Sequence, residues 1–153
     1  MNLEFARHRE LTPPRSDWEL AACSVSDDGD AICLWVSGAG SVVTRTSDDA
    51  AVSVSLDHVR FPAIGALPEG GFVITDTRLR VDPVSGARGS VSSWVFDGDG
   101  EVVAEGSLGD GIEHLLTTPG GAIWVGYFDE GVYGGGEIEH HGLVRFDANL
   151  EPE

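Results

Sequence analysis

The densest group of acidic and aromatic side chains lies in a glycine-rich stretch near the end of the chain. Asp129 and Glu130 stand between Tyr127 and Tyr133. Because binding groups are commonly carried by loops on a rigid framework, we select these four residues as candidate ligand contacts. The alternative is a flexible connector with incidental acids, since the segment 131–136 is largely glycine.

Glu113 and His114 form a second candidate. They lie in the short run 112–118, which we predict to be a strand. Neighbouring strand residues point to opposite sides of a sheet, so one of the two side chains can face a channel or groove. The alternative is a structural or surface role, because the positions 50 residues earlier, Ala63 and Ile64, are apolar and supply no second copy.

Two other segments have the residue types of metal sites without the spacing. The segment 137–141 places two histidines after two glutamates, which are ordinary ligands for divalent ions, but the pattern defines no geometry and favours a solvated loop. The segment 97–101 resembles the start of a calcium loop, yet Leu108 occupies the position of the closing glutamate. We therefore predict a hairpin turn there, no metal or other cofactor, and no catalytic residue, since no phosphate-binding or nucleophile motif is present.

The charge balance excludes some partners. Nine basic residues against 26 acidic ones give a net charge of −17, which repels nucleic acid and anionic lipid. No apolar run approaches the roughly 18 residues of a membrane span, and the charged N-terminus does not match a secretory signal. We therefore expect a soluble, cytoplasmic protein. All nine basic residues are arginines, which we attribute to a high-GC bacterial genome.

Two cysteines, Cys23 and Cys33, are too few for a disulfide-stabilised scaffold. They also lack the spacing and the partner ligands of a zinc site. We expect both of them to be buried free thiols.

The elements that carry these residues belong to an internal repeat. Gly70-Gly71 recurs as Gly120-Gly121 and Phe96-Asp97 recurs as Phe146-Asp147, both at an offset of 50. At this offset the apolar run 72–75 falls on 122–125. A weaker copy, with 31–34 matching 72–75, precedes them at an offset of 41, and a loop insertion at 78–89 explains the difference. The chain is therefore expected to be one domain, 1–153, with repeats at about 18–57, 58–107 and 108–153.

Each repeat is predicted to be a series of short antiparallel strands, which makes the chain all-β. The predicted strands are 31–36, 61–67, 72–75, 91–96, 101–105, 112–118, 122–128 and 143–146. The strands 31–36 and 122–128 are apolar at consecutive positions, which is typical of a strand that is buried on both faces. The residues that we expect to pack between sheets are Trp35, Ile74, Phe96, Ile123, Trp124, Val125 and Phe146.

The third repeat resembles the repeats of bacterial β-propellers of the two-component-regulator, NHL or streptogramin-lyase type. The resemblance lies in Pro119-Gly120-Gly121, Trp124-Val125-Gly126, Glu130-Gly131-Val132, Gly142-Leu143 and Arg145-Phe146-Asp147. It implies a partial β-propeller of about three four-stranded blades, with no final strand after Asp147. A closed ring usually needs roughly four blades or more, so the chain is expected to be a fragment of a larger propeller or to associate with other copies.

The propeller family that the third repeat resembles includes sensory domains, protein-binding scaffolds and metal-dependent lyases. Three functions fit this resemblance. The first is a non-enzymatic module that binds a protein or a small molecule through its channel face and loops. The second is a metal-dependent lyase or lactone hydrolase in which His114, Glu113 and acids of other blades converge at the channel. The third is a truncated gene product without a role of its own. Open blade faces also predict self-association.

Calorimetric titration with zinc and with manganese is expected to show no micromolar binding by the 137–141 segment, because flanking glycines do not fix its ligands. Micromolar binding that disappears when His140 and His141 are both replaced by alanine would contradict this expectation.

Overall fold

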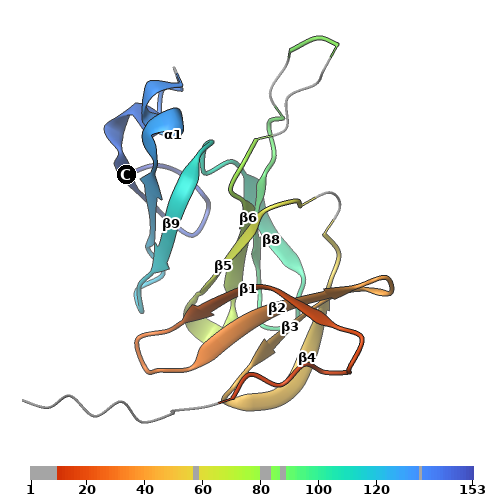
Figure 1. Ribbon diagram of the computed structural model, residues 1–153. Helices are drawn as coiled ribbons and strands as arrows, with labels where there is room; N and C mark the ends of the chain where they lie inside the picture. The colour runs from red at the N-terminus through yellow and green to blue at the C-terminus, as the bar shows by residue number, and fades with distance from the viewer. Residues whose placement is uncertain (1–9, 57–58, 80–83, 87–88, 135) are drawn as a thin grey trace, which may run out of the picture.

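The chain folds as an all-β protein, as predicted. The computed structural model describes residues 10–56, 59–79, 84–86, 89–134 and 136–153. Within these residues, eleven strands form three antiparallel sheets (Figure 1). Helical structure in the same residues is limited to α1 (Asp129–Tyr133) and to two short 3-10 turns, η1 (Pro68–Gly70) and η2 (Glu139–His141). None of these described helices has the length and apolar character needed to cross a membrane.

Every sheet is an up-and-down series in which each strand pairs with the next one along the chain. The first sheet contains β1 (Glu19–Val25), β2 (Ala31–Ser37), β3 (Gly40–Arg45) and β4 (Asp48–Val54). The second contains β5 (Pro62–Ala66), β6 (Phe72–Asp76), β7 (Ser93–Phe96) and β8 (Val102–Gly106). The third contains β9 (Ile112–Thr117), β10 (Ile123–Tyr127) and β11 (Leu143–Phe146). All eight strands predicted from the sequence are confirmed, with bounds that differ by a residue or two.

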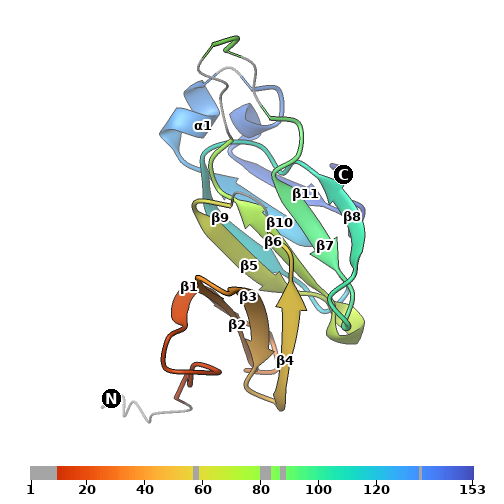
Figure 2. The same ribbon diagram turned by 90° about the vertical axis from the view of Figure 1, so that its right-hand side faces the viewer.

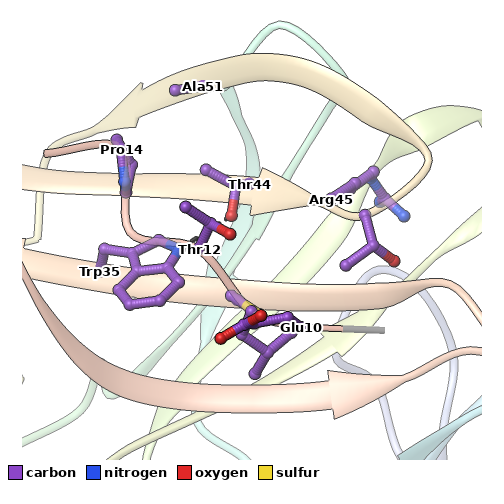
Figure 3. A pocket seen from close by; sticks show the side chains of 10 residues that line it. Glu10, Thr12, Pro14, Trp35, Thr44, Arg45 and Ala51 are labelled. Carbon is purple, nitrogen blue, oxygen red and sulfur yellow. Dashed lines mark hydrogen bonds between the residues drawn. The ribbon is translucent and has the colours of Figure 1, made fainter. Parts of the chain in front are cut away.

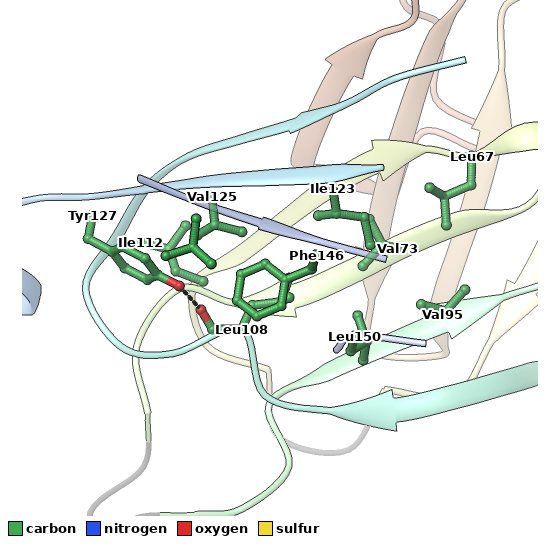
Figure 4. Close-up of a cluster of buried hydrophobic side chains, with 11 residues drawn as sticks. Leu67, Val73, Val95, Leu108, Ile112, Ile123, Val125, Tyr127, Phe146 and Leu150 are labelled. Carbon is green, nitrogen blue, oxygen red and sulfur yellow. Dashed lines mark hydrogen bonds between the residues drawn. The ribbon is translucent and has the colours of Figure 1, made fainter. Parts of the chain in front are cut away.

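The second sheet lies between the other two, and its first strand, β5, contacts both β1 and β9 (Figures 1 and 2). One apolar cluster joins the first and second sheets and includes Ile32, Leu34, Phe72, Ile74 and Phe96. The other joins the second and third sheets and includes Val73, Val95, Ile123, Val125 and Phe146 (Figure 4). All five residues of β6 are buried, because alternate side chains enter opposite clusters.

The same tight turn occurs in all three sheets. It covers Ser26–Asp30, Asp97–Glu101 and Asp147–Glu151, and in each the first N–H donates to the fifth carbonyl oxygen and the fourth N–H to the first. This is a type I turn followed by a bulge, whose fourth residue has a left-handed backbone. That residue is Gly29, Gly100 or Leu150. The predicted hairpin turn at 97–101 is therefore confirmed.

The predicted alignment of the second and third repeats is wrong by one residue in β6. Phe72 pairs with Phe96, and Ile123 pairs with Phe146. Phe72 and Ile123 both face the preceding sheet, so Phe72 corresponds to Ile123 and not to Ala122. The β6–β7 connection is one residue longer than the β10–β11 connection. The extra residue stays in the connection and does not shift the strand pairing, because a one-residue slip would turn every side chain to the other face.

Two predicted packing residues lie outside the interfaces between sheets. Trp35 is buried on the outer face of the first sheet, against Leu11 and Trp18. Trp124 is 36% exposed on the outer face of the third sheet, so β10 is buried on one face only. The prediction of no final strand after Asp147 is confirmed for the described residues, because the third sheet has three strands. After the turn at 147–151, Pro152 forms only an isolated bridge with Phe146.

The β5–β6 turn contains a strained residue. Glu69 has φ 56° and is followed by Gly70 at φ 78°, a type I′ arrangement that strongly favours Asn-Gly. Glu69→Asn is expected to raise the free energy of unfolding by about 0.5–1 kcal/mol, because a left-handed backbone costs roughly 1 kcal/mol or more for most side chains and least for asparagine and glycine. Urea unfolding would measure the difference. Glu101→Asn, at an exposed site without a left-handed backbone, is the control and should give no gain.

Candidate binding surfaces

The sequence-selected residues fall in three separate places. Tyr127 lies in the core between the second and third sheets, where its hydroxyl donates a hydrogen bond to the carbonyl oxygen of Leu108 (Figure 4). Burial, with a smaller effect from the charge of Glu139, raises the pKa of Tyr127 well above its ordinary value. Its hydroxyl therefore stays protonated in the folded protein.

Asp129, Glu130 and Tyr133 lie on α1, so this segment is a helical turn. Two carboxylates in the first turn suit the positive end of the helix. Glu130 pairs with Arg78 at 2.8 Å between Oε2 and Nη1, and the same guanidinium lies 4.4 Å from the ring centroid of Phe128. The Tyr133 side chain is 86% exposed. Arg78, which follows β6, thus meets Phe128 and Glu130, which follow β10.

Glycine allows α1 to approach the core closely. A Cβ atom on Gly111 would lie 2.8 Å from the Cα of Gly131, and one on Gly131 would lie 2.7 Å from the carbonyl oxygen of Asp110. These distances are shorter than ordinary contacts, so both positions require glycine. Gly131 thus serves a close backbone contact, which spacing alone does not reveal.

Two buried carboxylates were missed by the sequence analysis. Asp76, which ends β6, accepts hydrogen bonds from the backbone N–H groups of Arg60, Phe61 and Arg78. Glu139 is 5% exposed and accepts from the N–H of Asp110 at 2.8 Å. Both acids hold connecting segments by their backbones. No distinctive sequence pattern marks either acid. Glu139 lies in the segment that we predicted to be a solvated loop.

The 137–141 segment is therefore only partly solvated. His140 and His141 are exposed, with ring centroids 3.9 Å apart, whereas Glu139 points inward. In the part of the chain that the structure describes, no group of three or more histidine, cysteine or acidic side chains is placed to hold a metal ion.

Glu113 and His114 border a groove where the first strands of the three sheets meet. This groove, which we call the first-strand groove, has a volume of about 350 Å³ and is lined by residues 22–24 of β1, 62–64 of β5 and 113–116 of β9. Both Glu113 and His114 are exposed. The structure thus brings this pair to the same groove as Cys23, whereas Tyr127, which pairs with Ile112, points into the core.

The outer face of the third sheet exposes a row of large apolar side chains. Trp124 pairs with Leu116 on one side and with Arg145 on the other, while Gly126 pairs with His114 and Leu143. Partner residues point to the same side of a sheet. Leu116 is 66% exposed and Leu143 is 59% exposed. A hollow of about 700 Å³ runs along this face and continues to Ile138, His141 and Pro152.

A smaller cavity lies on the opposite side of the molecule. It has a volume of about 240 Å³ and separates residues 10–14 from the outer face of the first sheet. Trp35 forms part of its floor, with its indole N–H donating to the hydroxyl of Thr44 at 2.8 Å (Figure 3). Cys33 also lines this cavity.

Tyr127→Phe is expected to lower the free energy of unfolding by about 1–2 kcal/mol, because the buried Leu108 carbonyl loses its hydrogen bond. Tyr133→Phe removes an exposed hydroxyl and should change stability by less than about 0.5 kcal/mol. The wild-type stability should also fall as the pH rises above about 10, where tyrosine ionises in the unfolded chain but Tyr127 stays protonated in the folded one. Urea unfolding of the three proteins at neutral and alkaline pH would measure both effects, and equal losses in the two variants would refute this role of Tyr127.

Comparison with known proteins gives no relative from which a role can be transferred. No family model matches the chain, and searches of curated proteins and of solved structures found no significant match. Functional inference therefore depends on the internal repeat and on the surfaces described above.

Proposed function

We propose that the chain is a non-enzymatic binding module of the β-propeller type, and that the outer face of the third sheet takes a β-sheet of a protein partner. The first partner to consider is a second copy of the chain. The observation that carries the proposal is the row of Leu116, Trp124 and Leu143 side chains, which are exposed on a face that the two earlier sheets keep covered.

The propeller assignment is supported by the arrangement of the sheets. Blades of a propeller are up-and-down sheets that pack face to face with their first strands nearest the axis. Here β5 contacts β1 and β9, and all three sheets carry the same bulged turn. The described sheets do not close into a ring, so the first and third sheets each retain a face toward the outside.

The repeat itself indicates what covers such a face. Ile32 and Leu34 of the first sheet pack against the second sheet, and Val73 and Val95 of the second pack against the third. The pairing register places Trp124 and Arg145 at the positions of Val73 and Val95. A third sheet that follows the same rule would pack its Trp124 face against another sheet.

Charge sets the conditions for this contact. Arg145, 46% exposed, lies on the face, with its guanidinium 3.3 Å from the Glu153 carboxylate. The chain as a whole carries −17, so two copies repel each other at long range. Salt screens exposed charges beyond about 8 Å at physiological ionic strength, which weakens the repulsion and leaves the apolar contact.

Self-association of the purified chain is expected to increase with salt, and sedimentation velocity at low and high salt would measure it. Leu143→Glu should weaken the association at least about tenfold, because a carboxylate would have to be desolvated at the centre of the contact. Val103→Glu is the matched control, because Val103 is 61% exposed on β8, away from this face. A wild-type monomer at both salt concentrations, or equal effects of the two substitutions, would refute a second copy as the partner.

A further inference from the structure

The two cysteines face each other across the first hairpin. Cys23 of β1 pairs directly with Cys33 of β2. Their sulfur atoms lie 3.5 Å apart, and the Cys33 thiol donates a weak hydrogen bond to the Cys23 sulfur. The expectation of two buried thiols is therefore half wrong, because Cys33 is buried but Cys23 is exposed.

The hairpin register makes this pair suitable for a disulfide bond. The N–H of Ser26 donates to the carbonyl oxygen of Asp30, and hydrogen-bonded and non-hydrogen-bonded pairs alternate from there along an antiparallel ladder. Ser24–Ile32 is then a hydrogen-bonded pair and Cys23–Cys33 a non-hydrogen-bonded one. Cα atoms in such pairs lie about 4.5 Å apart, which falls within the range of about 4.4–6.8 Å that a disulfide spans.

The two thiols differ in access to a reagent. Cys23 is exposed on the edge strand β1, whereas only 1% of Cys33 is exposed. Burial, followed by the contact with Cys23, raises the pKa of Cys33 to about 12. Because the thiolate is the attacking species, the exposed Cys23 reacts first with an external oxidant. The buried Cys33 then reacts with the mixed disulfide on Cys23.

We propose that Cys23 and Cys33 form a reversible disulfide by exchange with a low-molecular-weight disulfide such as oxidised glutathione. The Cys23 thiolate attacks one sulfur of the reagent, whose S–S bond breaks, and the first reagent thiol leaves. Cys33 then loses its proton and attacks the Cys23 sulfur in the mixed disulfide, which releases the second reagent thiol. Two cysteine thiols are oxidised and one reagent disulfide is reduced to two thiols, so protons and electrons balance.

The bond would change the hairpin that borders the groove. A disulfide restrains the unfolded chain, and in the folded chain it requires the two sulfur atoms to approach from 3.5 Å to about 2.05 Å. It would fasten β1, which otherwise has one partner strand in its sheet, and it would consume the exposed thiol of Cys23. The modification is independent of the partner proposed for the third sheet, because Cys23 and Cys33 lie on the first.

The test is to incubate the reduced, full-length chain with oxidised glutathione, to block the remaining thiols with an alkylating reagent, and to measure intact mass and peptide masses. We expect the loss of two hydrogen atoms, no alkylation, and a peptide pair linked through Cys23 and Cys33. Reduced glutathione should reverse the change. The oxidised chain should unfold at a temperature higher by on the order of 5 °C.

Single-cysteine variants separate the two roles. Cys33→Ser, or Cys33→Ala if the serine variant does not fold, should accumulate a glutathione adduct on Cys23. Cys23→Ser should leave Cys33 unmodified in the folded protein. In denaturant, the one remaining thiol of each variant should react with glutathione to the same extent. A stable adduct on Cys23 of the wild type with Cys33 still free would overturn the proposal, and so would disulfides formed only between chains.

Discussion

Burial of the second sheet on both faces is the constraint on which the rest of the structure depends. Every side chain of β6 is buried, with Phe72 and Ile74 in one cluster and Val73 in the other. The ring of Phe72 also stacks on Phe96 with centroids 5.0 Å apart. Apolar burial contributes roughly 25 cal/mol for each Å² removed from water, and only the second of the three described sheets packs against another sheet on both faces. The second sheet therefore provides the surface against which each neighbour becomes stable.

The repeated bulged turn shows how the same backbone accepts different side chains. In the first and second sheets a glycine occupies the left-handed position, which costs least. In the third sheet Leu150 occupies it at φ 65°, and its side chain is buried in the cluster between the second and third sheets. Burial of a leucine side chain is worth about 1.5–3 kcal/mol, which offsets the roughly 1–2 kcal/mol cost of a left-handed residue. Packing therefore explains why a leucine is tolerated at this turn.

The strands could be predicted from the sequence because their signals are local. Short apolar runs between glycine-rich turns mark β2, β6, β10 and the others, and the repeated Phe-Asp pair marks the end of the third strand of each later repeat. Which face of a strand is covered is not a local property. The apolar pattern of β10 is like that of β2, yet Trp124 is exposed because no described sheet follows the third.

The candidate site was predicted only in part for the same reason. Glu113 and His114 line the first-strand groove. Tyr127, which we selected as a ligand contact, lies in the core, and Glu139 is buried although its segment was predicted to be a solvated loop. Each of these depends on a contact across sequence distance, such as the hydroxyl of Tyr127 with the Leu108 carbonyl. A periodic pattern carries no information on such contacts.

The stacking order has a consequence for how the molecule opens. The described sheets contact their neighbours in sequence, as the units of a linear array do, and the stability of such an array is a sum of unit and nearest-neighbour terms. The first or the third sheet can then detach while the other two remain packed, whereas loss of the second exposes both clusters together. Amide protons of β6 and β7 should consequently exchange only by global unfolding, and those of β4 and β11 by partial opening at the ends of the stack.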